Sequence, residues 1–199
     1  MCCVCSGCEV SAVVLTGGRS TRMGTDKLRL PLGDRTMAEH AVRKLRALGV
    51  GEILLAGGNL KISGTVSVGD IYPGAGPLAG IHAGLKRARK ETVFVLGADT
   101  PLVPETLLSA MLAHHRSSGN DITIAAHGEK YEPLIGVYER RVFSIAERLL
   151  NEKRYSVRGL WKTHTVAFFP WHDETAFLNC NTREDYERVL AVLGQQNNI

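Results

Sequence analysis

The chain has 199 residues, of which 44% are hydrophobic and 6% aromatic, and it carries 24 lysines and arginines against 20 aspartates and glutamates. This length and hydrophobic content suffice for one domain with its own core, which excludes disorder over most of the chain. The net charge of +4 is small, the basic residues are scattered, and aromatic residues are few. These three features favour a small anionic ligand over nucleic acid as the partner.

No apolar run approaches the roughly 18 residues of a membrane span, and the first residues lack the basic region and apolar stretch of a signal peptide. We therefore expect a cytoplasmic protein with no membrane partner. The first nine residues include Cys2, Cys3, Cys5 and Cys8. Cys5 and Cys8 have the C-x-x-C spacing of a metal site, but no second pair follows. The favoured interpretation is a flexible, cysteine-rich extension over residues 1–9, ahead of one domain over residues 10–195.

Apolar runs of strand length alternate with segments of helical periodicity along the chain. The predicted elements, in chain order, are strand 10–15, helix 36–48, strands 53–56 and 65–68, helix 78–89, strand 93–97, helix 104–116, strands 122–126 and 134–138, helix 142–151, strand 166–170 and helix 182–193. This alternation predicts a single α/β domain, with a mostly parallel central sheet and helices on both faces. Ligands of such sheets bind beyond the carboxyl ends of the strands, so the residues that follow strands matter most.

The turn after the first predicted strand has the composition of a phosphate-binding loop. Residues 15–27 have the sequence LTGGRSTRMGTDK. Glycines let the backbone approach an anion closely, and consecutive N–H groups can then bind phosphate. Arg22 and Lys27 would add positive charge. The spacing is neither the Walker pattern nor the Rossmann glycine pattern, but an ordinary glycine-rich turn would not explain the glycines, hydroxyls and cations together.

Asp70 stands at the end of a predicted strand, before a turn rich in proline and glycine and a new helix. The start of that helix would offer free N–H groups to an anion or to the edge of a base. Taken alone, this segment is better explained as a crossover turn in which Asp70 caps the backbone.

Asp99 comes directly after the wholly apolar strand 93–97 and Ala98. A carboxylate with a buried support and a solvated tip is a typical ligand of a hard cation such as Mg²⁺. The alternative is a turn or capping residue before Pro101.

Asn179 and Asn181 alternate in an extended segment, so we expect both side chains to face the same side. Thr182 and Asp185 have the spacing of a capping box, with Asp in place of Glu. Capping does not account for the two asparagines. Elsewhere, His40 is expected to be packed on the inner face of its helix, and the adjacent His114 and His115 to be solvated at a helix end.

Together these segments resemble the molybdenum cofactor guanylyltransferase family. Its members are nucleotidyltransferases with a Rossmann-like domain. The first motif of that family resembles L-x-G-G-x-S-x-R-M-G-x-D-K, and residues 15–27 match every fixed position. Four later segments are similar to family motifs, in the same order: residues 69–80, Asp99-Thr100-Pro101, Glu132-Pro133-Leu134 and Asn179-Cys180-Asn181-Thr182. The last resembles an N-x-N-T-P box with Arg183 in place of the proline. The resemblance extends from about residue 10 to residue 193.

The resemblance implies a Mg²⁺-dependent transfer of GMP from GTP to the terminal phosphate of molybdenum-bearing molybdopterin, with release of pyrophosphate. A molybdoenzyme or a chaperone would receive the product. By the same resemblance, GTP is bound by Leu15, Thr16, Gly17, Gly18, Lys27, Asp70 and Asp99. The catalytic residues are Arg22, Lys27 and Asp99, of which Asp99 also binds the metal. Asn179 and Asn181 line the pterin side or help to hold the metal. Family members often carry an asparagine just after the second strand, where this chain has Ala56-Gly57-Gly58, so Asn59 is the candidate substitute.

Two alternatives stay open. A cytidylyltransferase of the same fold would use CTP, although Gly17 favours guanine by resemblance, because cytidylyl relatives tend to carry alanine there. A non-catalytic molybdopterin-binding carrier could retain the fold. The presence of Arg22, Lys27 and Asp99 argues against the carrier.

Overall fold

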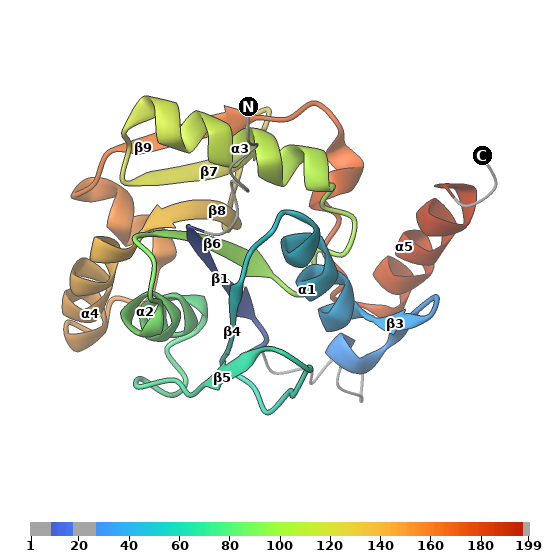
Figure 1. Ribbon diagram of the computed structural model, residues 1–199, viewed down its shortest axis with the longest axis horizontal. Coiled ribbons are helices and arrows are strands. Elements are labelled where there is room, and N and C mark those ends of the chain that lie inside the picture. Colours follow the sequence, from blue (N-terminus) through green and yellow to red (C-terminus); the bar gives the residue numbers. More distant parts are fainter. Residues whose placement is uncertain (1–8, 18–26, 197–199) are drawn as a thin grey trace.

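The computed structural model describes residues 9–17 and 27–196. The four N-terminal cysteines, Gly18 and Arg22 lie outside the described residues. A seven-stranded sheet forms the centre of the domain, in the order β5-β4-β1-β6-β8-β7-β9 (Figure 1). Its strands are β1 Val10–Leu15, β4 Glu52–Ala56, β5 Val66–Val68, β6 Thr92–Gly97, β7 Ile122–His127, β8 Lys130–Glu139 and β9 Val166–Pro170. Only β8 runs antiparallel to its neighbours, so the mostly parallel sheet is confirmed.

Helices cover both faces of this sheet. Figure 1 shows α2 and α4 on one side and α1 and α3 on the other, with α5 beyond α1. The helices are α1 Met37–Ala47, α2 Pro77–Arg87, α3 Glu105–Ser118, α4 Phe143–Asn151 and α5 Arg183–Gln196. Short 3₁₀ helices include η1 Lys27–Arg29 and η3 Val157–Lys162. No helix of the described ranges is long and apolar enough to cross a membrane.

The central strand β1 is buried along its whole length, because both of its faces are covered. Ala12 and Val14 pack in the hydrophobic cluster under α1 and α3, while Val13 and Leu15 pack in the cluster under α2 and α4. Helix α2 lies so close to β1 that a Cβ on Gly84 would be 2.4 Å from Val13 Cγ2. A Cβ on Gly80, one turn earlier in α2, would be 2.8 Å from Leu15 Cδ2, so the start of α2 lies over the carboxyl end of β1.

The predicted elements are all present, but β8 begins four residues before its predicted start at Leu134, and other elements differ by smaller amounts at their ends. Helix α2 stops at Arg87, and α5 begins one residue after its predicted start because Thr182 is the capping residue. The sequence patterns did not predict the ribbon of β2 Pro31–Leu32 and β3 Arg35–Thr36, whose strands are too short for any periodicity.

The expectation for the histidines at the end of α3 was wrong. His115 is buried, with Nδ1 2.9 Å from Thr123 Oγ1 and Nε2 3.0 Å from Glu139 Oε1. His114 is partly buried, and its ring lies 5.4 Å from that of Phe169. Both results follow from the packing of α3 on β7, β8 and β9. His40 is partly buried as expected, and its Nε2 lies 2.6 Å from the Leu32 carbonyl oxygen.

Candidate functional site

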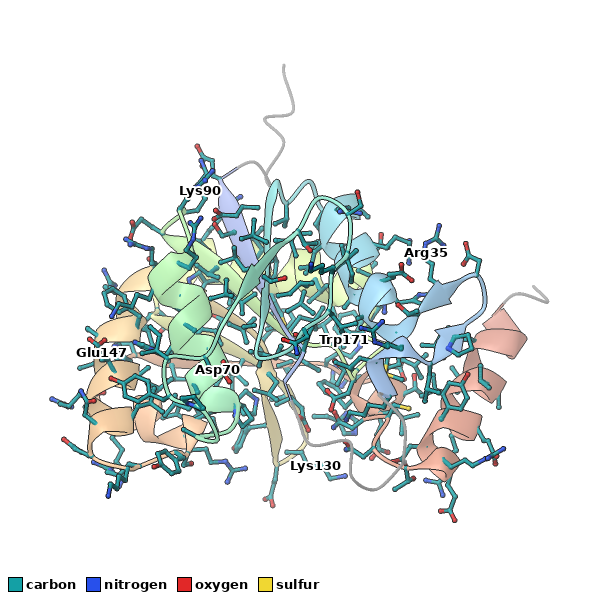
Figure 2. All side chains as sticks on the ribbon, turned by 90° about the horizontal axis from the view of Figure 1, so that it is seen from below. Arg35, Asp70, Lys90, Lys130, Glu147 and Trp171 are labelled. Atoms are coloured by element: carbon teal, nitrogen blue, oxygen red, sulfur yellow. The ribbon has the colours of Figure 1, made fainter. Side chains whose placement is uncertain are left out.

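A cleft of about 890 Å³ opens where β1, β4 and β6 end. Figure 2 places Asp70 and Lys130 at this end of the sheet and Lys90, which precedes β6, at the opposite end. Several of the predicted site residues line the cleft: Leu15, Thr16, Gly17, Lys27, Asp70, Asp99 and Asn181. Asn179 is partly buried but is not among the lining residues. The structure therefore brings together residues that are far apart in the sequence.

Two loops in close contact form the floor of the cleft. The Thr16 backbone N–H donates to the Ala56 carbonyl at 2.8 Å, and the Thr16 hydroxyl donates to the same oxygen at 3.1 Å. A Cβ on Gly17 would lie 2.6 Å from the Gly57 carbonyl oxygen, and a Cβ on Gly58 would lie 2.8 Å from the Thr16 carbonyl oxygen. Glycine is therefore required on both loops for this approach.

The same contact bears on the asparagine that family members often carry after the second strand. Backbone occupies the space next to Gly57 and Gly58, so no side chain projects into the cleft there. Asn59 is exposed and is not among the lining residues. The proposed substitution by Asn59 has no support in the structure.

The Asp70 carboxyl is partly buried between Gly57 and Gly80. Cβ atoms built on those glycines would lie 3.5 and 3.9 Å from Asp70 Oδ1. This oxygen is buried and has no hydrogen-bond partner among the described residues. Burial raises the pKa of Asp70 above its ordinary value. A buried acceptor without a partner costs about 1–3 kcal/mol. We therefore expect a ligand that donates a hydrogen bond to it. The alternative role for Asp70, as a backbone cap, finds no support here.

Helix α2 begins at the edge of the cleft. Its N-cap, Gly76, has a φ of 70°, a conformation that favours glycine, and no side chain caps the helix. Gly76, Pro77 and Gly80 line the cleft. Pro77 has no N–H and the Ala79 N–H donates to the Gly76 carbonyl at 3.1 Å, so the first turn offers the Leu78 N–H and the positive end of the helix dipole, which favour an anion.

Lys27, Asp99 and Asn181 meet at the other side of the cleft. Lys27 Nζ donates to Asp99 Oδ2 at 2.9 Å and to Asn181 Oδ1 at 2.7 Å. The side chains of Lys27 and Asp99 are 15% and 24% exposed. The carboxylate and amide oxygens thus already converge on one cationic group. Because Mg²⁺ prefers such oxygen ligands, this donor set fits a divalent cation.

The loop that carries Asp99 is held by three other segments. The Ala98 N–H donates to the Leu15 carbonyl at 3.2 Å, and the Cys180 N–H donates to the Asp99 carbonyl at 2.8 Å. The buried Lys44 of α1 donates to the Pro101 carbonyl. Sequence reasoning gave no role to Lys44. The helical pattern could have indicated a buried lysine, because Lys44 stands at an inward position between Ala41 and Leu45.

Burial sets the protonation of two groups near the Asp99 loop. It lowers the pKa of Lys44 to about 8, and the neighbouring Arg43 acts in the same direction. It also raises the pKa of the Cys180 thiol to about 11. Cys180 is fully buried. A thiol of this kind is inert near neutral pH, so Cys180 packs and does not react.

The segment that carries Asn181 is fixed by the predicted capping box. Asp185 accepts from the backbone N–H groups of Asn181 and Thr182, at 3.0 and 2.8 Å. The Asp185 N–H donates in turn to the Thr182 hydroxyl at 3.1 Å. The start of α5 therefore holds Asn181 in place beside Lys27.

A further carboxylate lies near Asp99. Glu132, at the start of β8, is partly buried, and its pKa is raised by burial and by the negative charge of Asp99. Nevertheless, the described residues contain no group of three or more His, Cys, Asp or Glu side chains that could hold a metal ion. A divalent cation here would have few protein ligands, as is typical of Mg²⁺ sites completed by substrate phosphates and water.

The sequence profile of the MobA-like NTP transferase domain matches residues 12–167. The chain belongs to this family. Among its relatives, a probable molybdenum cofactor guanylyltransferase of Carboxydothermus hydrogenoformans is 32% identical over 192 residues, covering 92% of this chain and 96% of the relative. A protein of the same description from Chloroflexus aggregans is 34% identical over 206 residues, covering 94% of this chain and 97% of the relative.

Solved structures confirm the fold of this MobA-like domain. The molybdopterin-guanine dinucleotide biosynthesis protein A of Archaeoglobus fulgidus matches with a TM-score of 0.79 and 22% identity, over 93% of this chain and 99% of that protein. A CMP:2-keto-3-deoxy-manno-octonic acid synthetase complexed with CTP matches with a TM-score of 0.75 and 14% identity, over 94% and 99%. The fold is therefore shared by a protein of molybdopterin-guanine dinucleotide biosynthesis and by a synthetase solved with CTP.

Proposed function

We propose that this MobA-like protein is a molybdenum cofactor guanylyltransferase. It transfers GMP from GTP to the terminal phosphate of molybdenum-bearing molybdopterin. In this reaction an oxygen of the acceptor phosphate attacks the α-phosphorus of GTP, the bond from that phosphorus to the bridging oxygen breaks, and pyrophosphate leaves with the electron pair. The observation that carries the proposal is the convergence of Lys27, Asp99 and Asn181 at one side of a glycine-lined cleft. Relatives at 32% and 34% identity with the guanylyltransferase description support it.

The nucleoside would bind at the Asp70 side of the cleft. The unpartnered Asp70 Oδ1 can accept a hydrogen bond from a ribose hydroxyl or from the N–H edge of guanine. The backbone of Leu15, Thr16 and Gly17 and the uncapped start of α2 would bind the phosphates. Gly18, which follows in the same loop, would extend this binding surface.

The triphosphate would reach Lys27 and Asp99 at the other side. Asp99 and Asn181 would hold Mg²⁺, which when bound neutralises charge on the phosphates and the leaving group. Lys27 would then move from Asp99 to the phosphates, and Arg22 would add a second positive charge at the pyrophosphate. Such chemistry depends on in-line positioning and charge neutralisation more than on an acid or base. Asn179 would support the acceptor side only indirectly, because it does not line the cleft.

The choice of guanine rests on Gly17 and on the relatives. An alanine at this position, as in the cytidylyl relatives, would bring Cβ to 2.6 Å from the Gly57 carbonyl oxygen and would force the two loops apart. In this chain the two loops approach each other so closely that only glycine fits at the points of contact. The product would pass to a molybdoenzyme or its chaperone in the cytoplasm.

The test is pyrophosphate release from GTP, CTP, ATP and UTP, each with Mg²⁺ and molybdopterin. We expect release from GTP alone, and only when both the metal and the acceptor are present. Release from CTP at the same rate would replace the guanylyl assignment by the cytidylyl one. Nucleotide binding without release under any condition would favour the carrier.

A further inference from the structure

Three aromatic side chains, one exposed and two partly buried, form a cluster on the side of the sheet covered by α2 and α4. The aromatic cluster consists of Tyr131 in β8, Trp161 in η3 and Phe168 in β9. The Tyr131 and Phe168 ring centroids are 4.4 Å apart, and Trp161 meets both rings edge-on at 5.9 and 5.4 Å. Phe168 is 42% exposed. Tyr131 and Trp161 are partly buried. An aromatic cluster with one ring open to solvent, in a chain with few aromatics, suggests a binding surface.

The strand register explains why the rings meet. β8 and β9 both pair with β7, where Tyr131 lies opposite Ala126 and Phe168 lies opposite Ile124. The small side chain of Ala126 leaves room for the two rings to meet over β7. Trp161 closes the cluster from η3 and packs against the same hydrophobic core as Leu134.

Strand β8 connects the aromatic cluster to the cleft, although none of the three rings lines the cleft. Leu134 lines the cleft. Glu132 follows Tyr131 directly, and its pKa is raised by burial and by the charge of Asp99, whereas the charge of Arg158 acts to lower it. In the strand order, β5 and β4 lie on the Asp70 side, β6 carries Asp99 at its end, and β8, β7 and β9 follow on the other side. The reacting centre therefore lies between the expected nucleoside site and the aromatic cluster.

The charges beside the aromatic cluster are positive. The Arg158 guanidinium carbon is 5.5 Å from the centroid of the Trp161 ring, and Arg158 makes no ion pair within the described part of the chain. Lys162 is also exposed on the same 3₁₀ helix. In addition, Trp161 Nε1 is buried without a hydrogen-bond partner among the described residues. The rings and the adjacent cation suit a planar heteroaromatic ligand that carries a negatively charged group.

We propose that Tyr131, Trp161 and Phe168, with Arg158, form the binding platform for the heteroaromatic ring of the acceptor, the pterin of molybdopterin. This inference rests on the proposed function, because it assigns the acceptor half of the same site. β7 lies two strand spacings from β6, or about 10 Å. A ring stacked on the platform could therefore present a phosphate on a short side chain to Asp99.

The probe is a pterin with a phosphorylated hydroxymethyl side chain, and its binding is followed by its own fluorescence. The test variant is Phe168→Ser, because this side chain is exposed and its loss leaves the core intact. Loss of one stacking surface should weaken probe binding about 10-fold. Arg158→Gln should weaken it less and should reduce its salt dependence. The matched control is Leu190→Ser, a comparably exposed apolar residue on α5, which should bind the probe like the wild type.

Affinity for GTP with Mg²⁺, measured by calorimetry on the same proteins, separates this inference from the proposed function. We expect that affinity to be unchanged in both platform variants. Wild-type affinity of Phe168→Ser and Arg158→Gln for the probe would overturn the platform, and so would failure of the wild type to bind the probe. Displacement of the probe by guanosine would also overturn it, since the surface would then bind the donor's base. Failure of the wild type to bind GTP would overturn the proposed function instead.

Discussion

Replacement of Lys27 by methionine should change the binding of a divalent cation and the binding of nucleotide in opposite directions. Lys27 Nζ donates to Asp99 Oδ2 at 2.9 Å and to Asn181 Oδ1 at 2.7 Å, so in the free protein the ammonium lies where a metal ion would use the same oxygens. A metal ion that binds alone must first displace the lysine. A metal ion that arrives with a triphosphate finds Lys27 drawn to the phosphates.

The size of the effect follows from this geometry. A partly exposed lysine–carboxylate pair contributes up to about 1 kcal/mol, which corresponds to about fivefold in affinity. Repulsion between an ammonium and a divalent ion about 4 Å apart adds up to about 2 kcal/mol at the dielectric constant of water. Lys27→Met should therefore bind Mn²⁺ alone at least about fivefold more tightly than the wild type. Its affinity for GTP with Mg²⁺ should fall, because a phosphate-binding cation is lost.

The assay is a titration with Mn²⁺ followed by electron paramagnetic resonance of the free ion, with calorimetry for the nucleotide. The matched control is Lys86→Met, which removes a lysine paired to Glu147 at 2.7 Å on the surface of α2 and α4. It should leave both affinities unchanged. If Lys27→Met bound Mn²⁺ no more tightly than the wild type, the Asp99 and Asn181 oxygens would not be the ligands of the metal ion.

Three further changes test other parts of the site. Asp99→Asn should lower the rate of pyrophosphate release by more than about 100-fold without loss of fold, because the metal supplies several kcal/mol of charge stabilisation; an unchanged rate would remove Asp99 from the metal site. Gly17→Ala should lower the melting temperature and weaken GTP binding, since Cβ would lie 2.6 Å from the Gly57 carbonyl oxygen, whereas Gly51→Ala, with no atom within 4 Å of its Cβ, should do neither. Burial lowers the pKa of Lys44 to about 8 in the folded protein from the 10.5 of an ordinary lysine, so the unfolded chain binds more protons between these values. The stability of the wild type relative to Lys44→Met should therefore rise with pH from 8 to about 10, by up to about 3 kcal/mol in urea denaturation, and a flat difference would contradict the burial of this charge.

The parts of the fold that sequence predicted well depend on local patterns. The apolar run of β1 and the threonine–aspartate spacing before α5 have one physical meaning each, a buried strand and a capped helix, and both are present. Asp99 was predicted to be a site residue because it follows a buried strand, and the sheet brings it to the cleft.

The missed features depend on contacts between distant segments. Asp70 could have been a capping residue until the structure showed Oδ1 buried without a partner. The helical pattern marked an inward position for Lys44 but not the carbonyl that it would meet. His115 was expected to be solvated because its neighbours on β7 and β8 could not be known from the helix alone. The aromatic cluster joins residues of three elements, and nothing in their spacing predicts it.

A crystal structure with Mn²⁺ and a non-hydrolysable GTP analogue tests the central claim most directly. The anomalous signal of manganese locates the ion independently of the protein. We predict one peak at bonding distance, about 2.1 Å, from oxygens of Asp99 and Asn181 and of the triphosphate. We also predict phosphates against the backbone of Gly17, with Lys27 bound to them. An ion that contacts neither side chain, or a nucleotide bound outside this cleft, would contradict the account.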